Sequence, residues 1–318
     1  MFTEQQNFAV VQTQLDSVFY QTFDYDATHP GIATANTAAL FRPLNTTHAA
    51  YIEQIFKGSG YFPVVGETQT VPQSTPKVSN QLTTYIKDFA QGIEISKNLF
   101  DDNMHGVWSK AVSDFAMVAR VSQDQNAFNF FNGAFTTSLT ADGSAFIGTH
   151  TLINGQSYSN LVTTTDTGTV TTALDPTTLY AAQVKLRQQP NQAGVILGNV
   201  GSILLVPSAL WKHAIEITDS ALIADSGNNN INVYRSAYGI TVYTSPFLDS
   251  ITGFSSGSNT AWFLLSRNHA VTRLIRQGIQ TALRDWSVSN NRTYFYQANF
   301  RETVYAADYC GAVGALGT

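Results

Sequence analysis

The segment DDNMHGVWSKAVSDFAMVARVSQDQNAFNFF, residues 101–131, constrains the fold more than any other part of the sequence. Its apolar residues recur at intervals of three and four, the spacing of one face of an α-helix. They are Met104, Val107, Trp108, Ala111, Phe115, Val118 and Ala119. Asp101 and Asp102 stand where an N-cap and the helix dipole favour acids. A helix of about 28 residues would reach roughly 40 Å, which is long for a compact enzyme and typical of a structural spine.

Two extended regions precede this helix. Residues 1–45 carry scattered apolar positions and the breaker-rich patch DATHPGIATANT, which predicts an arm with one short helix near its start that buries little on its own body. Residues 61–96 contain two β-rich runs around the proline-marked PQSTPKVSN, which predicts a long antiparallel hairpin. An isolated hairpin is marginally stable and its open edges invite pairing, so something else must cover it.

The second half of the chain alternates helices and strands. DPTTLYAAQVKLRQQ predicts a helix capped by Asp175 with Pro176 in its first turn. GSILLVPSALWKHAIEI predicts a buried strand that runs into a helix near Pro207. Strands are expected at residues 239–245 and 261–266, with loops at ADSGNNNIN and TGFSSGSN.

The C-terminal region has the alternation of a strand. RTYFYQANFRETVYAADY predicts one or two long strands that return to the spine helix. The residues expected on one face are Tyr294, Tyr296, Ala298 and Phe300. GAVGALG lacks the following helix that a nucleotide-binding loop requires and is either a flexible end or a final edge strand. The chain as a whole is of the α+β class.

Composition and charge limit the function classes. Charged residues make up 12% of the chain, against roughly a quarter in an average soluble protein, which favours a surface covered by partners. A net charge of -5 argues against a dedicated nucleic-acid reader. Cys310 is the single cysteine, so an internal disulfide and a Cys-based zinc site are excluded. No signal peptide or long apolar run is present, which indicates a soluble cytosolic protein.

The stretch TADGSAFIGTHTL brings an acid, a hydroxyl and an imidazole close together in sequence, as Asp142, Ser144 and His150. It has no Gly-x-Ser-x-Gly elbow, and Asp-Gly is ordinary turn chemistry. We expect a turn at Asp142 and Gly143, and a local hydrogen bond for His150 in place of proton transfer from Ser144. The other histidines have no metal-ligand spacing, so no catalytic, cofactor or metal site is expected.

The order of these features resembles a known family. An arm, a projecting hairpin, a spine helix, the loop LTADGSAFIGTHTLINGQSYSNL, a subdomain opened by ILLVPSALWKHAIEI and a long β return are similar to the major capsid proteins of tailed bacteriophages, with the Hong Kong 97-like coat fold. Those two segments resemble the Mu-like major head proteins in particular. The resemblance covers the chain from about residue 38 onward.

The resemblance implies a division of the chain into domains. These are an N-terminal arm (1–45), an extended hairpin loop region (46–96), a peripheral domain with the spine helix (97–199), an axial domain (200–266) and a return to the peripheral domain (267–318). Little sequence precedes the hairpin to hold a cleavable scaffolding region, and Met1 favours a separate scaffolding protein.

The resemblance also implies a function and partners. The expected function is self-assembly into pentamers and hexamers of an icosahedral shell around packaged double-stranded DNA, in the virion and, during assembly, in the host cytoplasm. A portal protein, a scaffolding protein and a decoration protein are expected partners, without a membrane. Six of the ten arginines lie within residues 267–301, as inter-element or inter-subunit ion pairs or as a surface facing nucleic acid. The candidates for inter-subunit or DNA-facing contacts are Lys77, Arg273, Arg276, Arg284, Arg292 and Arg301.

Two rival functions stay open at this point. One is the shell subunit of an encapsulin-like nanocompartment, which has the same fold and encloses cargo enzymes. The other, ranked lower, is a hydrolase that uses Ser144 and His150.

Overall fold

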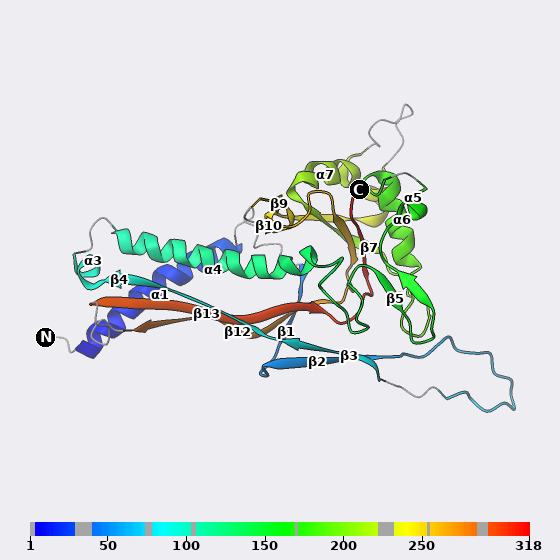
Figure 1. Cartoon of the computed structure of the whole chain (residues 1–318), viewed down its shortest axis with the longest axis horizontal. Helices are drawn as coiled ribbons and strands as arrows, with labels where there is room; N and C mark the ends of the chain where they lie inside the picture. Colours follow the sequence, from blue (N-terminus) through cyan, green and yellow to red (C-terminus); the bar gives the residue numbers. More distant parts are fainter. Residues whose placement is uncertain are drawn as a thin grey trace. The chain divides into compact units, whose positions relative to one another are not determined.

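The computed structural model describes residues 4–28, 40–73, 78–102, 106–168, 171–221, 232–252, 255–284 and 292–318. The chain divides into two compact units. The first comprises Met1–Tyr51, Tyr85–Ala127 and Arg273–Val304, and the second comprises Ile52–Thr84, Phe128–Thr272 and Tyr305–Thr318. Figure 1 shows the course of the chain through both units.

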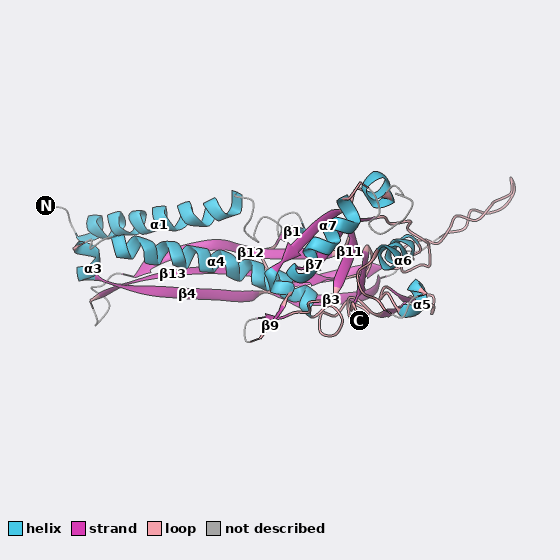
Figure 2. Cartoon of the chain, turned by 90° about the horizontal axis from the view of Figure 1, so that it is seen from above, coloured by secondary structure: helices cyan, strands magenta, loops and turns pink. Residues whose placement is uncertain are grey.

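The first unit is built on a four-stranded sheet with long helices along it. The strand order is β1 (Arg42–Asn45), β12 (Val271–Arg284), β13 (Thr293–Ala306) and β4 (Lys87–Ser96). The helices are α1 (Glu4–Thr28), α3 (Lys97–Asp101) and α4 (Val107–Asn132), and Figure 2 shows α1 and α4 running along the strands. The inward alternation of β13 is confirmed, since Tyr294, Tyr296, Ala298 and Phe300 are all buried.

The spine helix is confirmed, but its start differs from the prediction. At 26 residues α4 is about 39 Å long. Asp101 and Asp102 do not cap it, because Asp101 ends the separate helix α3, whose N-cap is Ser96. Gly106, with a φ of 65°, has a left-handed backbone that separates the two helices. Met104 and His105 lie outside the described residues.

The prediction of an arm with one short helix was wrong. Helix α1 has 25 residues, and its residues Leu15 and Phe19 are fully buried. The Phe19 ring lies 5.8 Å from the ring of Phe115 on α4 and 6.0 Å from that of Tyr296 on β13. Apolar residues spaced by four, from Val11 to Phe23, give α1 one face that packs on the subunit's own core. Most of the expected loop DATHPGIATANT lies outside the described residues.

The hairpin is confirmed as a pairing of two strands, but the predicted strand positions were partly wrong. The paired strands are β2 (Ala50–Phe56) and β3 (Val78–Tyr85). Residues 57–73 form no strand, and their chain reverses at a turn where the Gln69 N–H donates to the Gly66 carbonyl (3.1 Å). The reversal therefore precedes the proline-rich stretch. The run QLTTYIKDFAQGIEIS divides at residue 86, since β4 pairs with β13 over ten residues, from Ser96 opposite Thr293 to Lys87 opposite Glu302.

The second unit contains a sheet in the order β14 (Ala312–Ala315), β11 (Trp262–Ser266), β7 (Gly201–Pro207) and β8 (Thr241–Ser245). Its helices include α5 (Thr164–Thr167), α6 (Pro176–Arg187) and α7 (Trp211–Asp219), with short helical turns η2 (Ser208–Leu210), η3 (Tyr234–Tyr238) and η4 (Pro246–Leu248). Two small two-stranded sheets pair β5 (Thr149–Thr151) with β6 (Ser157–Ser159), and β9 (Ser250–Ile251) with β10 (Ser255–Ser256).

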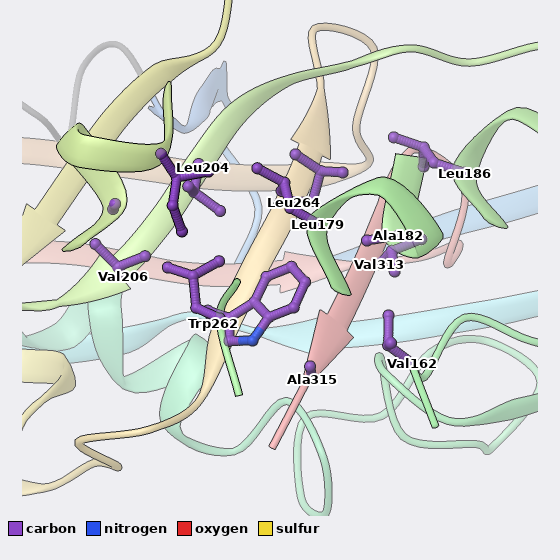
Figure 3. Packing of buried hydrophobic residues seen from close by; sticks show 13 residues of the cluster. Val162, Leu179, Ala182, Leu186, Leu204, Val206, Trp262, Leu264, Val313 and Ala315 are labelled. Carbon is purple, nitrogen blue, oxygen red and sulfur yellow. The ribbon is translucent and has the colours of Figure 1, made fainter. Parts of the chain in front are cut away.

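The core of this sheet is centred on Trp262, which is fully buried among aliphatic side chains (Figure 3). Its indole Nε1 donates to the Thr172 carbonyl at 3.1 Å. The predicted elements at α6, β7, α7, β8 and β11 are confirmed, and the Asp175 side chain accepts from the Thr178 N–H at 2.8 Å as an N-cap. The C-terminal glycine-rich stretch is the edge strand β14, fully buried, so the flexible-end alternative was wrong. Most of the loop ADSGNNNIN, and part of TGFSSGSN, lie outside the described residues.

Candidate functional site

The loop from Thr140 to Leu152 is organised by the carboxylate of Asp142. Asp142 accepts hydrogen bonds from the Thr140 hydroxyl, from the Ser144 N–H (3.0 Å) and from His150 Nδ1 (2.8 Å). Gly143, with a φ of 80°, adopts the left-handed backbone of the turn. The expected turn and the expected local hydrogen bond of His150 are therefore confirmed. The carboxylate binds Ser144 through its backbone, which is a structural contact and not the nucleophile–base contact that catalysis requires.

His150 is fully buried and stacks on Tyr309, with 4.2 Å between ring centroids. Burial would raise the pKa of Asp142, but the hydrogen bonds from His150, Thr140 and Ser144 outweigh it and lower that pKa to about 2. Burial also raises the pKa of the Cys310 thiol far above its usual range, so this cysteine carries no reactive thiolate near neutral pH.

Side-chain amides join this loop to the C-terminal strand. Asn160 accepts from the Gly148 N–H (2.8 Å) and donates to the carbonyls of Phe146 (2.8 Å) and Ala312 (3.2 Å). Gln189 accepts from the Gly311 N–H at 2.7 Å. Both amides are fully buried, and a buried polar group with its partners satisfied rigidifies the structure around it. The loop is thus a closed part of the subunit core.

The segment from Phe56 to Gln73 has the opposite character, because every residue in it is exposed. The exposed fractions are 96% for Phe62, 99% for Val64 and 71% for Val71. Burying a large apolar side chain stabilises by about 1.5–3 kcal/mol. The exposed side chains of this segment do not contribute this free energy to the folded subunit, but they would contribute it to binding if a partner covered them. Contiguous exposed apolar surface is typical of interaction sites, so this segment is the candidate interaction surface of the subunit.

The sequence predicted that this region projects and needs a partner to cover it, but it also predicted a strand within residues 61–71, which is wrong. The signal against a strand is in YFPVVG: Tyr61 and Phe62 precede Pro63, Val64 and Val65 follow it, and Gly60 and Gly66 flank the run. Such a run has no alternation, so it does not fit a strand with one buried face.

The structure places the predicted basic candidates in different settings. Arg273 lies on β12 and donates to Glu302 at 2.6 Å, and the Glu302 side chain is 2% exposed. Arg301 forms an ion pair with Asp88 of the neighbouring strand β4. Arg284 lies over the Phe295 ring at 5.9 Å. Arg276 is half-buried on β12, Arg292 is exposed, and Lys77 lies outside the described residues.

Other kinds of site are not found in the described part of the chain. Within it, no group of three or more His, Cys, Asp or Glu side chains is placed to hold a metal ion. None of the described helices combines the length and apolar character needed to span a bilayer.

Comparison with solved structures establishes the fold. A structure from Microbacterium phage Oxtober96 is 12% identical, with a TM-score of 0.51 over 88% of this chain and 90% of that one. The capsid of Cyanophage P-SCSP1u is 12% identical, with a TM-score of 0.54 over 87% and 86%. A virus-like particle from Pyrococcus furiosus is 6% identical, with a TM-score of 0.54 over 95% and 98%. The fold is the α+β, Hong Kong 97-like coat fold.

The sequence itself gives the family. The profile of the family described as Phage capsid protein matches residues 79–314, and the chain belongs to that family. None of the curated proteins matches the chain in sequence. Membership makes this protein a structural subunit of a capsid, which agrees with a loop built for packing and not for catalysis.

Proposed function

We propose that this protein is the major head protein of a tailed bacteriophage, of the Mu-like type, and that its copies form the pentamers and hexamers of an icosahedral shell around double-stranded DNA. The observation that carries the proposal is the segment Phe56–Gln73, exposed throughout and rich in apolar side chains. Its length approaches the roughly 20–30 residues that one partner contributes to a standard interface. The resemblance of residues 139–161 and 203–217 to Mu-like head proteins supports the finer assignment.

In this proposal the parts of the chain have separate roles. Residues 97–199 and 267–318 form the peripheral domain, except that β14 completes the sheet of the axial domain. Residues 200–266 form the axial domain that meets its copies at the centre of each capsomer. Within the hairpin region 46–96, strand β4 belongs to the subunit's own sheet, and the part from β2 to β3 covers a neighbouring copy. Repeated heterologous contacts of this kind close into rings and shells when the rotation closes.

The proposed partners follow from the same role. A portal protein and a separate scaffolding protein take part in assembly, and a decoration protein binds the finished shell. Contact with DNA is through phosphates and independent of sequence. Arg276, Arg284 and Arg292 are the better candidates for it, because Arg273 and Arg301 are paired with carboxylates inside the subunit.

The second candidate function is a shell that encloses cargo proteins instead of a genome. The likeness to the virus-like particle from Pyrococcus furiosus, over 95% of this chain, favours keeping it. The match to the phage capsid family favours the phage head. The two differ in the contents of the particle, since a head holds nuclease-protected DNA and a nanocompartment holds protein.

The test is negative-stain microscopy with sedimentation velocity on the purified protein, expressed alone and together with the products of the neighbouring genes. We expect closed shells, formed with the scaffolding protein if not alone. A monodisperse monomer under every condition, including crowding, would contradict the proposal. Particles that hold a fixed protein cargo and no DNA would favour the second candidate.

A further inference from the structure

A hydrogen bond near the start of the exposed segment attaches it to its own subunit. The Tyr61 hydroxyl oxygen accepts a hydrogen bond from the backbone N–H of Ile196, at 3.1 Å. The two residues are 135 positions apart in sequence and both belong to the second unit. From Phe62 to Gln73 the segment is exposed throughout, so this bond lies where the free part of the segment begins.

The other side of the contact is a turn whose own hydrogen bonds hold it rigid. The Asn191 side-chain oxygen accepts from the N–H groups of Ala193 and Val195, both at 2.9 Å. The Asn191 N–H donates to the Val195 carbonyl at 2.8 Å, and Pro190 and Ile196 form an antiparallel bridge. The direction of the Ile196 N–H is thus fixed by the turn.

Hydrogen bonds also connect this turn to the core of the second unit. The Leu197 N–H donates to the Gln189 carbonyl at 3.0 Å. Gln189 is fully buried, and its side chain bonds the Gly311 N–H at 2.7 Å. A chain of hydrogen bonds therefore connects the root of the segment to the C-terminal part of the second unit.

We infer that Tyr61 is a positioning residue for assembly: its bond to the turn Pro190–Leu197 sets the direction in which the segment leaves the subunit. The inference rests on the proposed function, because direction matters only if the segment binds another copy. A segment already pointing toward its binding surface loses less conformational freedom on binding. The apolar side chains Phe62 and Val64 supply the contact, and Tyr61 presents them.

The expected size of the effect follows from one hydrogen bond. A net contribution of about 1 kcal/mol corresponds to roughly a five-fold change in the population of the fixed direction. Tyr61→Phe removes the hydroxyl and keeps the ring, so the fold and the apolar surface are unchanged. Tyr180→Phe, which removes the hydroxyl of an exposed tyrosine on α6, is the matched control.

The experiment measures the direction of the segment in unassembled subunits. Spin labels are placed at Val64→Cys and Lys212→Cys, and both positions belong to the second unit. Val64 is 99% exposed, and the side chain of Lys212 is 86% exposed. Distances between them are obtained by pulsed electron paramagnetic resonance. Cys310, a free cysteine of intermediate exposure, is replaced by Ser in every variant, so that only the two introduced thiols carry labels.

We expect a narrow distance distribution with Tyr61 or with the Tyr180→Phe control, and a broadened one with Tyr61→Phe. The melting temperature should fall by no more than about 2–4 °C, and shell formation should slow by about the same five-fold factor. Identical distributions with and without the hydroxyl would overturn the inference while leaving the proposed function intact. A broadened distribution with an unchanged assembly rate would also overturn it. A wild-type protein that never assembles would contradict the proposed function. The distance measurement would then test only whether the Tyr61 hydroxyl fixes the direction of the segment.

Discussion

Two loops of the second unit differ in whether their apolar side chains are buried. In Thr140–Leu152, Phe146 and Ile147 are buried and the polar groups of Asp142 and His150 bond each other. In Phe56–Gln73, the apolar side chains are exposed. The first loop packs its apolar side chains into the core of the subunit. The apolar side chains of the second loop can be buried only by contact with another molecule. The loop that resembles an active site is therefore part of the packed core, and the loop without catalytic groups is the one that we propose carries the function.

The largest expected effect on stability is at Phe146. Its ring lies 5.1 Å from that of Phe130 and is fully buried. Phe146→Ala leaves a cavity and should lower the free energy of unfolding by about 3–5 kcal/mol. Denaturant titration measures it. A loss below about 1 kcal/mol would mean that the loop is not part of the core.

The next largest effect is at Asp142. Asp142→Asn keeps the shape but disturbs three hydrogen bonds, including the one from His150, and should cost about 1–3 kcal/mol. Thermal unfolding with Ser144→Ala as the control measures this. The control should change stability by less than about 0.5 kcal/mol and leave assembly normal. A hydrolytic activity lost in Ser144→Ala would restore the hydrolase interpretation.

Acid should destabilise the first loop through the same carboxylate. The pKa of Asp142 is about 2 in the folded protein, below its usual 3.8, so the unfolded chain takes up the proton first. Its stabilising contribution is complete above about pH 4 and is lost as the pH falls toward 2. Unfolding free energies measured across this range should fall less steeply in Asp142→Asn than in the wild type. Parallel curves would contradict this assignment.

The smallest expected effect on stability is in the second loop. Phe62→Ala removes a side chain that is 96% exposed, so the free energy of unfolding should change by less than about 0.5 kcal/mol. Compared with Phe146→Ala by the same titration, it should be nearly silent. A loss of several kcal/mol would mean that Phe62 packs inside its own subunit.

The sequence predicted elements whose periodicity is local and failed where tertiary contacts decide. Helix α4, the cap at Asp175 and the alternation of β13 follow from spacing and capping chemistry. Strand β12 was missed because its burial depends on partners on both sides. Helix α1 was underestimated, since its four-residue spacing is meaningful only against the core that it covers.

The site was predictable in part for a similar reason. The turn at Asp142 follows from Asp-Gly chemistry, which acts over a few residues. The YFPVVG run argues against a strand with one buried face, but the sequence alone does not distinguish a fully buried strand from an exposed segment at Phe62 and Val64. Arg273 and Glu302, which form an ion pair between β12 and β13, are 29 residues apart in sequence. Counting charges does not show which of them are paired.

The proposed function requires that the apolar side chains of the second loop bind another copy of the chain. It is tested most directly by Phe62→Ala combined with Val64→Ala, with unfolding and sedimentation velocity measured on the same preparations under conditions where the wild type forms shells. We expect a wild-type unfolding curve and a loss of closed shells. A destabilised subunit, or normal shells from a stable one, would contradict it.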